Sequence, residues 1–105
     1  MSGCLVYITA SGHEEATVVG RDLVEKRLAA CVNINQPVTS IYHWEGAVQE
    51  DVESVLIAKT TEDLVEALTA RVAEIHSYNC PCVVAVPIAG GNKEFLKWIA
   101  DETKQ

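Results

Sequence analysis

The chain has 105 residues, of which 49% are hydrophobic and 22% charged, and its formal net charge is -7. This composition predicts one globular domain with a core of its own and excludes a disordered chain. The negative charge argues against nucleic acid or an anionic membrane as a partner, because neither would be neutralised by this protein.

The N-terminal part predicts a strand and then a helix. Gly3 to Ala10 has the apolar character of a short buried strand. Ser11 and Glu14 have the spacing of a capping box, so we expect a helix that opens there and continues to about Ala30, directly before the next strand. Its apolar residues form one stripe at helical spacing: Ala16, Val19, Leu23 and Ala30, widened by Val24 and Leu28.

The next thirty residues predict a long β-hairpin. Cys31 to Trp44 is dense in β-branched and aromatic residues, Glu45-Gly46 supplies the turn, and Val48 to Thr60 forms the return strand. The return strand becomes continuously apolar at its end, as expected where both faces are covered. We expect a bulge or bend at Pro37, since proline cannot donate to a strand ladder.

The length of this hairpin predicts an oligomer. A strand from Cys31 to Trp44 would span roughly 45 Å, whereas a domain of this size has a diameter of roughly 35 Å. The ribbon should therefore overhang its own globule. An isolated two-stranded arm is marginally stable and exposes open edges, so we expect it to pair with further copies of the chain.

The second half of the chain completes a fold. Four segments follow in order: a helix capped by Thr60 to Asp63 and ending near His76, a loop around Pro81, a buried strand from Val83 to Ile88, and a short last helix after Gly90-Gly91-Asn92. The order β-α-β-β-α-β with a terminal helix predicts an α+β, ferredoxin-like fold, with two helices on one face of a four-stranded sheet. That fold hosts many activities, so it does not by itself indicate a function.

Five blocks of the sequence together resemble the CutA family of divalent-cation tolerance proteins. The blocks are Leu28-Ala29-Ala30-Cys31-Val32-Asn33, Ser40-Ile41-Tyr42-His43-Trp44-Glu45-Gly46, Ile57-Ala58-Lys59-Thr60, His76-Ser77-Tyr78 with Pro81, and Phe95-Leu96-Lys97-Trp98. The resemblance extends from about Val6 to Ile99. It implies a homotrimer of subunits interlocked through long hairpins, similar in plan to the PII signalling proteins. It also implies a link to copper or other divalent cations and no established catalytic activity.

Copper ligands proposed in the family carry over only in part. Where the resemblance expects a cysteine at the end of the first strand, this chain has Ile8, and where it expects two histidines the chain has Ile75-His76. His76 is thus the one carried-over metal ligand. We expect its imidazole to be exposed at the end of its helix, and the alternative is that it has a purely structural role there.

The segment Cys80-Pro81-Cys82 departs from the family pattern. Alternation along an extended segment puts Cys80 and Cys82 on the same side, so the two thiols could chelate a soft ion such as Cu(I) together with His76. The alternative is a simple junction between loop and strand. We expect no resident cofactor, and copper or another divalent metal ion as the candidate ligand.

A second group of residues predicts a cleft between subunits. The tryptophans and Tyr42 are expected to anchor subunit interfaces, because aromatic residues concentrate binding energy there. Lys59 follows an otherwise apolar run, and together with Trp44 and Tyr78 it could line an inter-subunit cleft that holds an anion or a small ligand.

Two classes of function therefore remain open, a metal-responsive binding trimer and a PII-like signalling or scaffold trimer that binds a small molecule or a partner protein. We expect no enzyme, since Cys31 has no histidine placed beside it as a base. The cysteine spacing matches neither a disulfide framework nor a closed zinc site. The first twelve residues resemble neither a signal peptide nor a membrane span, so we expect a cytoplasmic protein with reduced thiols.

Overall fold

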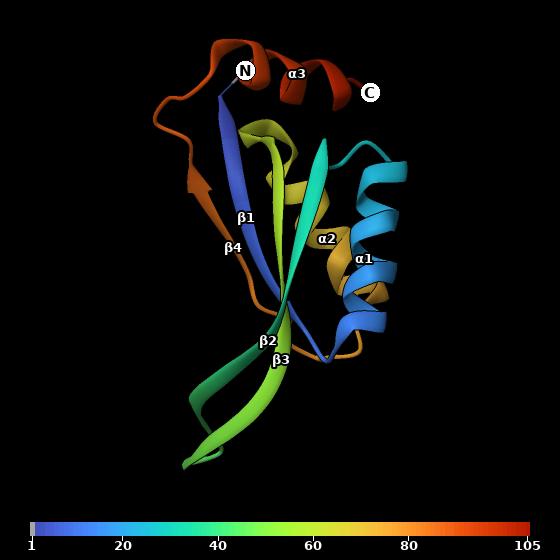
Figure 1. Ribbon diagram of the computed structural model, residues 1–105. Helices are drawn as coiled ribbons and strands as arrows, with labels where there is room; N and C mark the ends of the chain where they lie inside the picture. Colours follow the sequence, from blue (N-terminus) through green and yellow to red (C-terminus); the bar gives the residue numbers. More distant parts are fainter. Residues whose placement is uncertain (1) are drawn as a thin grey trace.

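A four-stranded antiparallel sheet with the strand order β2-β3-β1-β4 forms the centre of the molecule in the computed structural model, which describes residues 2–105 (Figure 1). The strands are β1 (Gly3–Ala10), β2 (Cys31–Trp44), β3 (Ala47–Thr61) and β4 (Val83–Pro87). The helices are α1 (His13–Glu25), α2 (Val65–Ile75), which follows a short 3-10 turn, and α3 (Lys93–Glu102). The predicted α+β, ferredoxin-like order is confirmed.

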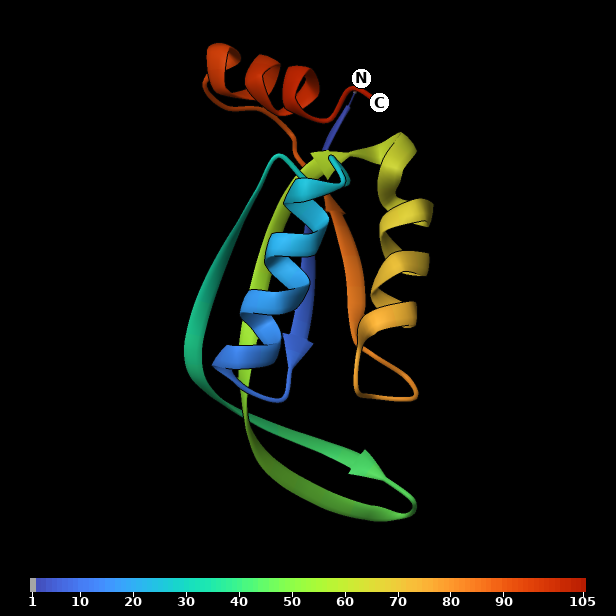
Figure 2. The same cartoon turned by 90° about the vertical axis from the view of Figure 1, so that its right-hand side faces the viewer.

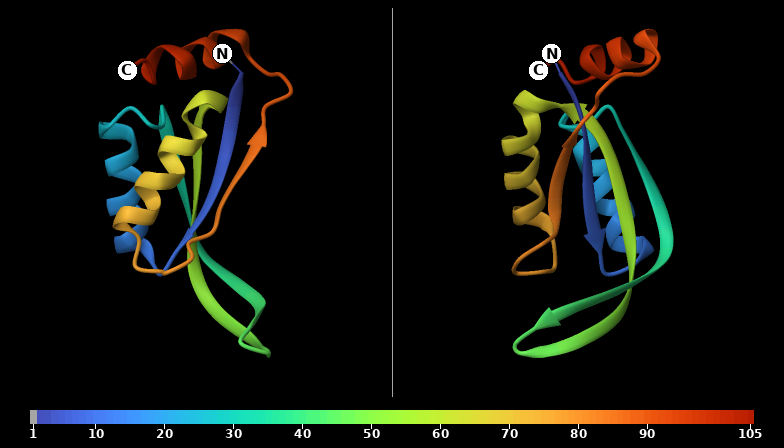
Figure 3. Two further views of the ribbon diagram at one scale, coloured as in Figure 1. Left: turned by 180° about the vertical axis from the view of Figure 1, so that it is seen from behind. Right: turned by 90° about the vertical axis from the view of Figure 1, so that its left-hand side faces the viewer.

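Two helices cover one face of the sheet, and the third lies across one end. Figure 2 shows α1 and α2 side by side on the same face, with α3 above the ends of the strands. Throughout residues 2–105, no helix combines the length and the apolar character that crossing a membrane requires. Within the described part of the chain, the other face of the sheet carries no helix (Figure 3).

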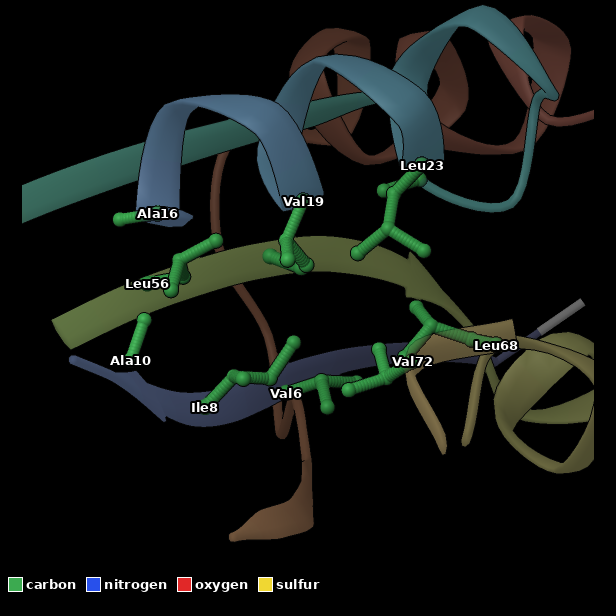
Figure 4. Packing of buried hydrophobic residues seen from close by; sticks show 11 residues of the cluster. Val6, Ile8, Ala10, Ala16, Val19, Leu23, Leu56, Leu68 and Val72 are labelled. Carbon is green, nitrogen blue, oxygen red and sulfur yellow. The ribbon is translucent and has the colours of Figure 1, made fainter. Parts of the chain in front are cut away.

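The core lies between the sheet and the two helices. Val6 and Ile8 of β1 pair in register with Ala58 and Leu56 of β3, so all four side chains point to the helix face. They pack against buried residues from both helices: Ala16, Val19 and Leu23 of α1, and Leu68 and Val72 of α2 (Figure 4). Ile8 is completely buried, and burying an aliphatic side chain of this size stabilises the fold by about 1.5–3 kcal/mol.

The predicted end of the first helix is wrong by five residues. α1 ends at Glu25 because Arg27 adopts a left-handed conformation with φ of 56°. The backbone N–H groups of Leu28 and Ala29 then turn back and donate to the carbonyl of Leu23, at 2.9 and 3.2 Å. Glycine usually occupies such a position. The sequence has an arginine there, so it gives no signal for the turn before β2.

The predicted capping box is also wrong. The helix is capped at Gly12 without a side-chain hydrogen bond, and the backbone N–H of Ser11 donates to Oε1 of Glu15, at 3.0 Å. The neighbouring Glu14 is exposed. Both glutamates lie in the first turn, where the helix dipole favours negative charge.

The long hairpin is confirmed. β2 and β3 pair from Cys31↔Lys59 to Trp44↔Ala47, and Glu45 and Gly46 form the turn with φ values of 50° and 78°. The register shifts between Asn35 and Val38, so Pro37 lies at the predicted bulge. Beyond this point the ribbon leaves the body of the molecule, which has a long dimension of 44 Å and two short ones of 25 and 22 Å (Figure 1).

One prediction for the sheet fails in the single chain. The apolar end of β3 is buried or half-buried as expected, whereas β4, which was expected to be a buried strand, has Val84 and Val86 53% and 51% exposed. These residues pair with Tyr7 and Leu5 of β1, which are also exposed. The reason is that no other part of residues 2–105 covers the side chains of Val84 and Val86 on the sheet face opposite the helices. We call the side chains of Leu5, Tyr7, Ile57, Val84 and Val86 the open face.

Two half-buried carboxylates join α1 to α2 and to the loop that follows it. Nε and Nη2 of Arg71 donate to the two carboxylate oxygens of Asp22 at 2.8 and 2.9 Å, and this guanidinium holds the pKa of the Asp22 carboxyl well below its usual range. At the other end, Oε2 of Glu15 accepts from the backbone N–H of Ser77, at 2.8 Å. Partial burial raises the pKa of Glu15, but the hydrogen bonds from Ser11 and Ser77 outweigh it and lower the pKa to about 2.

Replacing Glu15 should weaken the fold in a pH-dependent way. A carboxyl with a lowered pKa stabilises the folded state above its unfolded pKa, and this contribution is lost as the pH falls from about 4.5 to about 2. Glu15→Gln should therefore lower the free energy of unfolding by about 1–3 kcal/mol at pH 7 and flatten its acid dependence, measured by urea unfolding. Glu14→Gln is the matched control. An unchanged acid dependence in Glu15→Gln would contradict this assignment.

Candidate functional site

A cleft of about 680 Å³ opens where the ribbon curls beneath the loop that joins α2 to β4. Figures 2 and 3 show this curvature from opposite sides. The walls of the cleft come from β1, from the ribbon and from the loop between α2 and β4. In that order, the lining residues are Tyr7 and Thr9, then Thr39, Ser40, Ile41, Tyr42, Trp44 and Glu53, and finally Tyr78, Asn79, Cys80 and Cys82. The size lies within the range of small-molecule sites.

Aromatic side chains of the ribbon form one wall of the cleft. Tyr42 and Trp44 are 40% and 55% exposed. The hydroxyl of Tyr42 donates to Oδ2 of Asp51 on the facing strand. This hydrogen bond, with partial desolvation, raises the pKa of Tyr42. The phenol therefore stays neutral at physiological pH, and the nearby charge is that of Asp51.

A second phenol meets a second carboxylate where the loop after α2 reaches the ribbon. The hydroxyl of Tyr78 donates to Oε2 of Glu53 at 2.7 Å, which joins the loop after α2 to β3. Burial and the hydrogen bond to Glu53 raise the pKa of Tyr78 well above its ordinary value. Glu53 thus provides the cleft with a negative charge held in place by a neutral phenol.

Cys80 and Cys82 line the cleft together, as the alternation predicted. Cys80 is exposed, whereas Cys82 is half-buried, and burial raises the pKa of its thiol. Both are free thiols. Because a metal ion binds the thiolate, protons compete with metal at Cys82, and metal affinity should rise with pH.

His76 lies beneath the cleft, and the expectation of an exposed imidazole is wrong. Its side chain is 0% exposed. Nε2 lies 2.7 Å from the carbonyl oxygen of Thr9, and Nδ1 accepts from the backbone N–H of Tyr78 at 3.1 Å. A carbonyl can only accept, so Nε2 is the donor of this hydrogen bond, while Nδ1 is the acceptor of the other. Both ring nitrogens are thus engaged in holding the loop against β1.

Lys59 does not line this cleft. It pairs in register with Leu5 and Cys31, and its Nζ contacts Oδ1 of Asn33. The cleft residue Thr9 pairs with Val55, four positions further along β3, which corresponds to roughly 13 Å. Within one chain, the structure therefore brings Trp44 and Tyr78 together with the two cysteines and leaves Lys59 apart.

Several cleft residues were missed by sequence reasoning. Glu53 and Tyr7 lie in alternating strands whose outward positions look like ordinary solvent-facing ones. Their roles follow from the bulge after Asn35, which keeps Val38, Ser40 and Tyr42 on the side of Glu53. The sequence signal for the bulge was Pro37 alone. Across residues 2–105, no three His, Cys, Asp or Glu side chains converge closely enough to hold a metal ion.

The family model of the CutA1 divalent ion tolerance protein matches residues 4–102. The divalent-cation tolerance protein CutA of Thermus thermophilus is 48% identical over 99 residues, which cover 94% of this chain and 96% of that protein. The crystal structure of CutA1 from Oryza sativa superposes with a TM-score of 0.97 at 41% identity, covering 100% of this chain and 96% of the other.

A curated rice relative is longer than this chain. The protein called chloroplastic CutA 1 of Oryza sativa subsp. japonica is 43% identical over 101 residues, which are 96% of this chain but 57% of its own length. The chain thus spans little more than half of that relative and nearly all of the bacterial one. On the family model and the bacterial relative together, the chain belongs to the CutA1 family of divalent ion tolerance proteins.

Proposed function

We propose that this protein acts in divalent-cation tolerance as a homotrimer whose chains interlock through the β2–β3 ribbon. The observation that carries the proposal is the open face. Leu5, Tyr7, Val84 and Val86 are 36–53% exposed in one chain and form a contiguous apolar surface with Ile57. Monomeric proteins rarely leave such a surface in water, and burying it against another copy would be favourable.

The ribbon supports the same proposal. It exposes further apolar side chains, with Ile41, Val48 and Val52 all more than 60% exposed, and the alternation of β3 puts them on the side of Leu56 and Ala58. A neighbouring copy would cover both the ribbon and the open face. The number three comes from the family resemblance. The cytoplasm is the proposed location, because free thiols such as those of this chain persist in reducing compartments.

Assembly should depend on the open face. In sedimentation equilibrium at micromolar concentration, we expect the wild type to sediment as a trimer and Val84→Glu to dissociate, because the substitution places a charge in the buried interface. Val18→Glu is the matched control, since Val18 lies on α1 and is 59% exposed, against 53% for Val84. Circular dichroism checks that each variant is folded. A folded wild-type monomer would refute the trimer.

The proposed metal ligands are the thiols of Cys80 and Cys82, which face the same cleft. Thiolates favour a soft ion such as Cu(I). His76 was predicted as a third ligand. Binding a metal through Nδ1 would require the backbone N–H of Tyr78 to move away. The proposed site therefore rests on the two thiols, with His76 as a secondary ligand.

Removing both thiols should weaken copper binding. Affinity is measured by titration with Cu(I) against a chromogenic chelator under reducing conditions. Loss of a residue that only supports a metal ligand lowers metal affinity roughly tenfold. Cys80→Ser/Cys82→Ser removes two ligands, so it should lower the affinity by more than that. Cys31→Ser is the control, since Cys31 lies on β2 outside the cleft. Equal affinities of the double variant and the wild type would refute this site.

A second function has its own support in the cleft. Its volume and its aromatic walls suit a small molecule better than a bare ion. This favours a PII-like role in which the protein senses a small ligand or, through it, a partner protein. A ligand in the cleft would contact the ribbon and the loop after α2 together, so its presence could be communicated to the subunit contacts.

A further inference from the structure

We propose that Lys59 of one copy forms an ion pair with Glu53 of the next copy at the subunit interface. This inference rests on the trimer proposed above and names the pair of residues that fixes how its chains meet. Three observations carry it: the place of Lys59 beside the open face, the charge of the ribbon, and the orientation of Glu53 at the base of the ribbon.

Lys59 is a charged residue in a largely apolar part of the sheet. Its register partner on β1 is Leu5, and alternation along β3 puts it on the same side of the sheet as Ile57, so its side chain lies beside the open face. Lys59 is half-buried, and its Nζ contacts Oδ1 of Asn33, which is an uncharged amide. None of the ion pairs formed within residues 2–105 includes Lys59.

Covering the open face with another copy would remove water from this ammonium group. Burying a charge is strongly unfavourable unless an opposite charge pairs with it. Asn33 can accept a hydrogen bond from Lys59 but supplies no negative charge. The covering copy should therefore place a carboxylate against Lys59.

The ribbon of a neighbouring copy carries carboxylates. Its acidic residues are Glu45 at the turn and Glu50, Asp51 and Glu53 on β3. By alternation, Asp51 and Glu53 share the side of β3 on which Lys59 lies, whereas Glu50 lies on the other side. A ring of copies joins two different surfaces of the chain, here the ribbon of one copy and the open face of the next. Opposite charges on the two surfaces would select this arrangement.

Glu53 is the carboxylate best prepared for the contact. It is half-buried, whereas Asp51 is exposed. Its Oε2 accepts from the Tyr78 hydroxyl at 2.7 Å, so the side chain is oriented before assembly, and a carboxylate can accept further hydrogen bonds from an ammonium group. Along β3, positions 53 and 59 of one chain are separated by roughly 20 Å. The pair can therefore form only between copies.

Charge reversal tests the ion pair. Dissociation of the trimer is followed by sedimentation in increasing concentrations of urea, an uncharged denaturant that does not screen ion pairs. Lys59→Glu and Glu53→Lys should each dissociate at a lower urea concentration than the wild type, because each places like charges together at every interface. Lys59→Glu/Glu53→Lys restores opposite charges, so it should dissociate at a higher urea concentration than either single variant.

Lys59→Glu/Glu50→Lys is the matched control. It has the same net charge as the other double variant, but Glu50 lies on the other side of β3, so we expect no recovery relative to Lys59→Glu. Neutral variants provide a second measurement if a reversed chain does not fold. Glu53→Gln keeps an acceptor for the Tyr78 hydroxyl, and it should lower the urea midpoint clearly less in a Lys59→Met background, where the pair is already lost.

The outcomes separate this inference from the trimer. If the wild type is a trimer and Glu53→Lys gives no more recovery than Glu50→Lys, the ion pair is overturned and the trimer stands. Equal effects of Glu53→Gln in the wild-type and Lys59→Met backgrounds would overturn the ion pair in the same way. A wild-type monomer would refute the trimer itself, and the ion pair with it.

Discussion

The pairing of β2 with β3 is the constraint on which the rest of the structure depends. From Val55 to Lys59, β3 pairs with β1 as well as β2 and forms the centre of the sheet. From Ala47 to Glu53 it pairs with β2 alone and forms the ribbon. β3 therefore belongs to both the core and the projecting ribbon. The cleft lies where β3 passes from the core into the ribbon.

Much of the fold could be predicted from the sequence, because local patterns and the final structure agree. The strand-forming residues of the hairpin, the turn at Glu45-Gly46 and the apolar stripe of α1 up to Leu23 all indicated the observed elements. The errors arose where the determinant was not local. The left-handed Arg27 ends α1 without a glycine, and the exposure of β4 depends on what covers the open face.

The site was less predictable than the fold, for a physical reason. Alternation predicted that Cys80 and Cys82 share a side, and in the structure both line the cleft. The surroundings of Glu53 depend instead on the bulge at Pro37 and on the curvature of the ribbon, which bring residues 25 positions apart into contact, as in the hydrogen bond from Tyr78. The burial of His76 likewise depends on tertiary structure, since His76 follows α2 and its partner Thr9 belongs to β1.

The open face also bears on the life of the newly made chain. A single folded copy has its core on one side of the sheet and an exposed apolar surface on the other. In the cell, assembly with other copies of the chain would then compete with binding to chaperones, proteolysis and aggregation. The rate of synthesis, as much as the intrinsic folding of the domain, would decide how much usable protein accumulates.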